Sequence, residues 1–214
     1  MHQLGLDTAC TFVRTTLDEL TTVEETGFLV NADAVNLQKL VENSLVEAVV
    51  KTHLIASHLL IEGEDLNAGE GFYAEYETDG SITITLSRDT LRVISVKVEG
   101  SPIVCTMVPE DSPEGRMQMN PYTRGVADDP RVVMAKVRSD SYRPVLHFYS
   151  VEGTPDVLVE CIPYPKIEGN GVAIASRLEY AVLNELVAMV LDSVNEHDKA
   201  TLYRAKSQAI MEGK

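Results

Sequence analysis

The chain has 214 residues, of which 44% are hydrophobic, and a formal net charge of −15 from 18 basic and 33 acidic side chains. This length fits one elaborated domain or two small ones, with enough apolar residues for a sizeable core. The acidic balance disfavours DNA binding through a basic surface, because a phosphate-binding footprint needs clustered Lys and Arg.

The charge is spread unevenly along the chain. Residues 1–70 hold three basic and twelve acidic side chains, whereas residues 172–214 hold five and six. The middle of the chain carries most of the arginines, among them Arg116, Arg124, Arg131, Arg138 and Arg143. Most of the acidic excess therefore lies in residues 1–70.

The three cysteines, Cys10, Cys105 and Cys161, form no CxxC motif and lie among apolar residues. This pattern predicts buried, reduced thiols and an intracellular folding environment. The first residues lack the basic and apolar regions of a signal peptide. No apolar run approaches the length of a transmembrane helix.

Two helices are predicted at the N-terminal end. Apolar residues recur on one helical face over residues 7–20, and Gly27 breaks the pattern. A second helix is expected from near Asn31 to about His58, because it carries a long apolar stripe.

The apolar period then changes to two, which is typical of strands. Asp79-Gly80 suits the tight turn of a hairpin between the first two strands. The chain therefore predicts an antiparallel meander or sandwich, with strands within 72–77, 81–87, 91–98, 102–108, 131–137, 144–151 and 156–164.

The C-terminal end returns to helical periodicity. Ser176 and Glu179 have the spacing of a capping box, which would begin the first helix. Asn195 is expected to begin a second helix and so to complete a helical hairpin. The fold class is thus α+β: residues 1–62 and 171–214 form a helical bundle beside a central antiparallel β domain at 63–170.

The residues that could carry chemistry do not combine into a catalytic, cofactor or metal site. His53 and His58 are five apart instead of the four that places two ligands on one helix face. His147 lies within a predicted strand and is interpreted as a satisfied core or edge residue. The chain has neither a GxSxG motif nor a complete phosphate-binding loop. We expect no enzymatic activity.

One segment calls for a separate explanation. "PEDSPEGRMQMNPYTRG", residues 109–125, has three prolines and two glycines between two predicted strands. Its composition predicts neither helix nor central strand, and loops of such length are often functional. We expect an extended arm that contacts another subunit, although packing on its own domain is an equal alternative. The candidate contact residues are of types common at interfaces: Arg116, Met117, Gln118, Met119, Asn120, Tyr122 and Arg124.

Residues 85–211 resemble the ring proteins of the head-to-tail connector of tailed bacteriophages, with crAss-like phages of Bacteroidales as the closest match. The resemblance is carried by "LRVISVKV", "PIVCTMVPEDSPEGRMQMNPYTRG", "PRVVMAKV", "RPVLHFYS" and "LEYAVLNELVAMVLDSVNEHDKATLYRAKSQAIM". It implies a non-enzymatic virion protein that is assembled in the bacterial cytoplasm as a ring, commonly dodecameric. Its implied partners are the portal and other connector or tail rings, with genomic DNA passing through the channel without specific binding and no membrane involved.

Two other functions remain open at this point. A β-sandwich module that binds peptide or carbohydrate is the main alternative, although the chain has no Trp and only 6% aromatic residues. An enzyme without recognisable motifs is the second.

Overall fold

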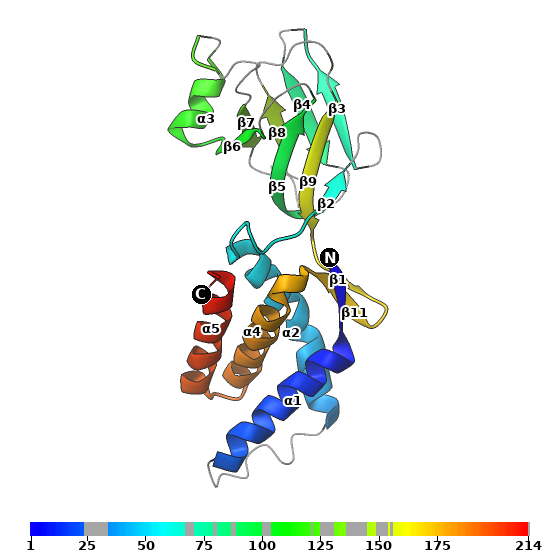
Figure 1. The fold of residues 1–214 in the computed structure, drawn as a ribbon, viewed down its shortest axis with the longest axis vertical. Helices are drawn as coiled ribbons and strands as arrows, with labels where there is room; N and C mark the ends of the chain where they lie inside the picture. Colours follow the sequence, from blue (N-terminus) through cyan, green and yellow to red (C-terminus); the bar gives the residue numbers. More distant parts are fainter. Residues whose placement is uncertain are drawn as a thin grey trace. The chain divides into compact units, whose positions relative to one another are not determined.

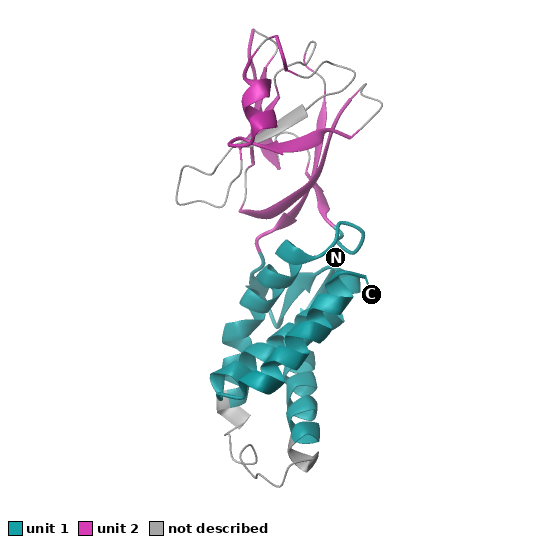
Figure 2. Ribbon diagram, turned by 90° about the vertical axis from the view of Figure 1, so that its left-hand side faces the viewer, with its two compact units in different colours: residues 1–62, 165–214 teal, residues 63–164 magenta. Residues whose placement is uncertain are grey.

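The computed structural model describes residues 1–23, 34–66, 71–78, 81–86, 89–99, 104–120, 122–124, 131–135, 145–148, 154 and 156–213. The chain divides into two units, which Figure 2 colours separately. Unit 1 comprises Met1–Glu62 and Pro165–Lys214, and unit 2 comprises Gly63–Tyr164. Residues 165–170, which we expected in the β domain, therefore belong to the helical unit. The α+β class is confirmed.

The described residues of unit 1 form four α-helices and a small sheet (Figure 1). Its helices pack on one another, with α4 against α5, α2 and α1. The elements are β1 (His2–Gly5), α1 (Leu6–Val23), α2 (Ala34–Ile55), β10 (Ile167–Glu168), β11 (Gly171–Ile174), the 3₁₀ turn η1 (Ser176–Leu178), α4 (Glu179–Ser193) and α5 (His197–Met211).

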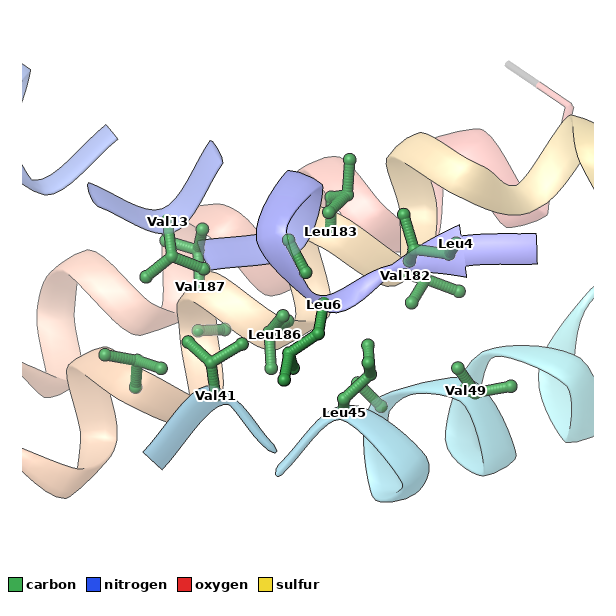
Figure 3. Close-up of a cluster of buried hydrophobic side chains, with 14 of the residues drawn as sticks. Leu4, Leu6, Val13, Val41, Leu45, Val49, Val182, Leu183, Leu186 and Val187 are labelled. Carbon is green, nitrogen blue, oxygen red and sulfur yellow. The ribbon is translucent and has the colours of Figure 1, made fainter. Parts of the chain in front are cut away.

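Helix α4 lies at the centre of this unit because it is apolar around almost its whole circumference. Ten of its 15 residues are buried, as expected for a helix with little polar surface. Its side chains Val182, Leu183, Leu186 and Val187 meet residues from β1, α1 and α2 in one cluster (Figure 3). Burial of such aliphatic side chains drives the packing of the helices.

Helix α2 ends earlier than the apolar pattern predicts. Its last helical bond runs from the amide of Ala56 to the carbonyl of Thr52, and the amide of Ser57 donates to Met211 of α5 instead. The expected extension to His58 is therefore wrong, because the backbone turns toward another helix. The expected start at Asn31 lies outside the described residues.

The α4–α5 hairpin depends on Asn195, which has a positive φ of 65°. The amide of Glu196 donates to Leu191, and that of Asn195 donates to Asp192. These two bonds form a Schellman motif, in which a residue such as Asn adopts the left-handed conformation after the helix. Asn195 thus ends α4 and does not begin α5, contrary to expectation.

The predicted capping box is also absent. Ser176 lies in η1, and neither that turn nor α4 has a side-chain cap. The carboxylate of Glu179 lies 3.1 Å from Nε2 of His2. The carboxylate of Glu179, which the capping box would have used, therefore pairs with a residue that is distant in sequence.

A three-stranded sheet in unit 1 was not expected. Its order is β1-β11-β10, with both pairs antiparallel. Strand β1 has four residues and β10 has two, which is too short for a period-two pattern to emerge. The amide of Leu6 donates to Asn170 at 2.7 Å, which joins the start of α1 to the turn of the hairpin.

Unit 2 contains two sheets, which share one hydrophobic cluster. The cluster takes Val96 and Val159 from the first sheet, and Leu146 and Phe148 from the second. The first sheet has the order β2-β9-β5, from Glu64–Leu66, Val157–Pro163 and Thr90–Val98. The second has the order β3-β4-β8-β7-β6, from Phe72–Tyr76, Ile82–Leu86, Val145–Phe148, Arg131–Ala135 and Thr106–Pro109.

The pairing of β6 with β7 corrects the expected antiparallel meander. These two strands are parallel, whereas the other pairs in unit 2 are antiparallel. Parallel neighbours need a crossover of a dozen or more residues, because a tight turn cannot bring the chain back to the starting edge. The long connection between Pro109 and Arg131 is therefore required by the topology.

The central position of α4 gives a stability prediction. Leu186 is fully buried, so Leu186→Asp should lower the free energy of unfolding by about 4 kcal/mol or more, through lost burial and an unpaired buried charge. The matched control is Leu202→Asp on α5, where the side chain is 63% exposed. Urea denaturation would measure both, and equal stability of the two variants would contradict the central role of α4.

Candidate functional site: the crossover between β6 and β7

The crossover contains a short helix, α3 (Pro113–Gln118), where the sequence predicted none. The hydroxyl of Ser112 accepts a hydrogen bond from the amide of Gly115 at 2.9 Å and donates one to the carbonyl of Pro109 at 2.7 Å. Pro113 occupies the first turn, where its missing amide proton costs nothing. The prolines that argued against a helix thus include one placed where a helix favours it. The expectation that this segment contains no helix is wrong, and its role as an extended inter-subunit arm stays a prediction.

Gly115 lets the helix approach the end of β6 closely. A Cβ atom at this position would lie 2.2 Å from the carbonyl oxygen of Pro109 and 3.0 Å from that of Glu110. Both atoms belong to the backbone and cannot move aside as a flexible side chain could. The absent side chain is therefore what allows α3 to sit against the chain that leads into it.

Asn120 closes the other end of the segment. Its side-chain oxygen accepts from the amide of Tyr122 at 3.0 Å, and its carbonyl accepts from the amides of Thr123 and Arg124. The hydroxyl of Thr123 also donates to the carbonyl of Met117 at 2.8 Å. Hydrogen bonds within the segment thus set the direction of the side chains between residues 112 and 124.

The predicted contact residues separate into two groups. Gln118 is only 2% exposed, and its amide nitrogen lies 3.3 Å from the carbonyl of Glu114. It faces its own chain, and Arg124 is half-buried. The other five side chains are exposed, and one of them, Asn120, bonds the amide of Tyr122 within the segment. We call the remaining four the crossover surface: Arg116, Met117 (50% exposed), Met119 (50%) and Tyr122 (96%).

The histidines singled out in the sequence have structural partners. His53 is fully buried: its Nδ1 donates to the carbonyl of Val49, and its Nε2 accepts from the amide of Ala175. His147 lies opposite Thr83 on β4, with 3.1 Å between Nδ1 and the hydroxyl. His58 is exposed beyond the end of α2.

A set of ion pairs that the sequence patterns did not predict connects three helices of unit 1. Glu185 on α4 is buried and pairs with Lys51 on α2, while Nε of Arg204 on α5 lies 3.7 Å from the same carboxylate. Arg204 also pairs with Asp192, which accepts from His197 at 2.9 Å. An acid amid the mostly apolar residues 181–191 is the signal that could have revealed this set, since a charge buried with them needs a partner.

None of the three cysteines, all of which lie in the described residues, forms a disulfide. Cys105 and Cys161 are buried as expected, but Cys10 is only partly buried. Burial raises the pKa of Cys105 to about 11, so its nucleophilic thiolate is scarce near neutral pH. These thiols act as small apolar side chains.

Within the described parts of the chain, no group of three or more His, Cys, Asp or Glu residues is placed to hold a metal ion. Among the helices of those same parts, none has the length and apolar character needed to cross a membrane. No protein-family model matches the chain, and no curated protein matches its sequence.

The close approach at Gly115 can be tested by substitution. Gly115→Ala should lower the free energy of unfolding by about 1–3 kcal/mol, because the added methyl group overlaps backbone oxygens. Gly5→Ala is the matched control, because its Cβ would meet only ordinary contacts at 3.6 and 3.9 Å. Urea denaturation with hydrogen exchange of residues 112–124 would measure the effect; unchanged stability and exchange in Gly115→Ala would contradict it.

The Asp192 interactions predict a dependence of stability on pH. The hydrogen bond from His197, followed by that from Arg204, holds the pKa of Asp192 below its ordinary value. This stabilisation is present above the ordinary pKa of an Asp, about 3.9, and is lost as the pH falls through the lower folded-state pKa. Asp192→Asn should therefore cost about 0.5–1 kcal/mol at neutral pH.

The measurement is urea denaturation of Asp192→Asn and wild type between neutral pH and about pH 2. The difference between them should shrink toward the acidic end. Glu168→Gln, which removes an exposed carboxylate on β10, is the control and should show no such convergence. A constant difference across the range would contradict the assignment.

Proposed function

We propose that the protein is a structural subunit of a homo-oligomeric ring in the head-to-tail connector of a tailed bacteriophage. The ring is dodecameric, its partners are the portal and neighbouring connector or tail rings, and it works in the virion. Genomic DNA passes through its channel without specific binding. The observation that carries the proposal is the crossover surface, and the resemblance over residues 85–211 gives the class of assembly.

The crossover surface has the chemistry of a protein contact. Met117, Met119 and Tyr122 are large and at least half exposed within six positions of one another, next to the cation Arg116. Single exposed apolar side chains are ordinary, but a group of them marks an interaction site. Met, Tyr and Arg are also enriched in the cores of interfaces.

The segment is also suited to binding because its conformation is already set. Ser112 and Asn120 close its two ends through hydrogen bonds within the chain. Ordering a loop on binding opposes association, so a segment fixed beforehand binds more tightly for the same contacts. These features favour a repeated structural contact.

The acidic composition supports the second part of the proposal. A formal net charge of −15 repels the phosphates of DNA except where basic side chains cluster. A channel lined by such a protein would let DNA pass without holding it.

One observation favours the alternative of a peptide-binding module. Strand β3 lies at the edge of the five-stranded sheet and carries two exposed tyrosines, Tyr73 and Tyr76. An extended peptide can add to such an edge through backbone hydrogen bonds. Peptide binding would therefore depend on β3, whereas ring formation would depend on the crossover surface.

The test is to measure oligomer mass by native mass spectrometry and electron microscopy, for the protein alone and with the portal protein of the same genome. Wild type should form closed rings of a single copy number. Met117→Ser combined with Tyr122→Ser should abolish the rings, because the double variant removes two large apolar side chains from the crossover surface. The control Tyr73→Ser should form rings like wild type.

Wild type that stays monomeric both alone and with the portal would overturn the ring proposal. If Tyr73→Ser lost binding to extended peptides while rings were never formed, the peptide-binding module would be the better account.

A further inference from the structure

The imidazole of His53 joins the last turn of α2 to the chain that leads into η1. The side chain is fully buried. Its Nδ1 lies 2.9 Å from the carbonyl oxygen of Val49 in the same helix, and its Nε2 lies 3.1 Å from the backbone nitrogen of Ala175. We call these two hydrogen bonds the His53 contact. The second bond connects residues that are 122 positions apart in the chain.

The two partners require a neutral ring and a single tautomer. A carbonyl oxygen only accepts, so Nδ1 carries the proton that Val49 accepts. A backbone amide only donates, so Nε2 carries none and accepts from Ala175. A protonated imidazole has donors on both nitrogens. Its Nε2 proton would face the amide proton of Ala175, so protonation breaks the bond between the two segments and keeps the one within α2.

The surroundings of the ring also disfavour a charge. Val49 and Ala56 lie four positions before and three after His53, which places them on the same face of α2. Both residues, like Ala175, are at most 1% exposed. Moving a charged group from water into such an apolar setting is costly, and burial therefore favours the neutral form of an imidazole.

Charged side chains on the neighbouring elements make interactions of their own. Helix α2 contacts α1, α4, α5 and β11, and β11 has no ionisable side chain. The pairs on the other elements and on η1 are Asp7 with Asn170, Glu179 with His2, Glu185 with Lys51, Glu212 with Gln208, and Arg177 with the carbonyl of Leu59. Each acid in these pairs already has a partner, which reduces what it can add to a protonated His53.

We propose that the His53 contact is a pH-sensitive device: protonation of His53 in mild acid releases the end of α2 from residues 174–178. The two segments have a special place in the chain, because residues 56–62 lead from α2 to unit 2 and residues 165–174 follow the return from it. Release of the contact therefore loosens the anchoring of both segments within unit 1. This device goes beyond the proposed ring function and does not depend on it.

The direction of the pH effect follows from the protons bound in each form. The closed form holds no proton on Nε2, whereas a His that opening exposes to water binds one below its ordinary pKa of about 6.5. The contact is therefore fully stable above that pH and is lost as the pH falls. Each pH unit below about 6.5 should raise the equilibrium constant for opening about tenfold. This range lies above the one in which Asp192 acts.

The experiment is amide hydrogen exchange by NMR on the full chain, between about pH 8 and pH 5. After correction for the intrinsic exchange rate, the protection of the Ala175 amide should be constant above about pH 6.5 and fall about tenfold per pH unit below it. The amide of Val187, a fully buried residue of α4, reports global unfolding. Exchange at Ala175 should depend less on added urea than exchange at Val187, because a local opening exposes less surface.

Two variants identify the titrating group. His53→Gln replaces the ring by an amide whose oxygen can accept from Ala175 and which does not titrate, so protection of Ala175 should no longer depend on pH. His58→Gln is the matched control, because it removes an exposed His five positions further along. This control should keep the pH dependence of wild type. The wild-type measurement stands alone if His53→Gln folds poorly.

Three results would overturn the proposal. The first is a protection of Ala175 in wild type that stays constant across the pH range. The second is a pH dependence that survives in His53→Gln or disappears in His58→Gln. The third is equal protection and equal urea dependence at Ala175 and Val187, since acid would then unfold the unit as a whole instead of releasing one contact.

Discussion

Neighbouring parallel strands cannot be joined by a tight turn, and this constraint shapes the candidate surface. The pairing of β6 with β7 commits the chain to a long crossover. That crossover must satisfy its own backbone groups, and it does so through the Ser112 cap and the Asn120 turn. With Gly115 held against the end of β6 and Gln118 turned inward, Met117 and Met119 on either side of Gln118 are left in solvent. The exposed apolar group is thus a consequence of how the crossover is anchored.

In unit 1 the constraint is a different one: the central helix is buried and also carries a charged side chain. Helix α4 needs apolar neighbours on nearly every side, and Val13, Val41 and Leu45 supply them from two helices (Figure 3). Its Glu185 is compensated by Lys51 and Arg204 from the helices on either side. Such pairs add little net stability over an apolar core, but removing one partner leaves a costly buried charge. The ion pairs therefore restrict which helices can stand next to α4.

Local sequence patterns were sufficient to locate the elements that depend only on residues near to them in the chain. Period-two alternation located the seven longer strands of unit 2, and helical periodicity located α1, α2, α4 and α5. The errors arise where a distant residue decides the outcome. Glu179 pairs with His2 instead of forming a cap, and the amide of Ser57 leaves α2 for Met211. Strand direction is likewise invisible to alternation, since β6 and β7 would show the same period in either orientation.

For the candidate surface too, the sequence indicated the residue types but not the directions in which the side chains point. Composition alone indicated a segment rich in interface residues, because Met, Tyr and Arg are recognisable without a fold. It could not separate Gln118, which faces inward, from Met117 and Met119, which face outward, because that separation follows from α3 and its cap.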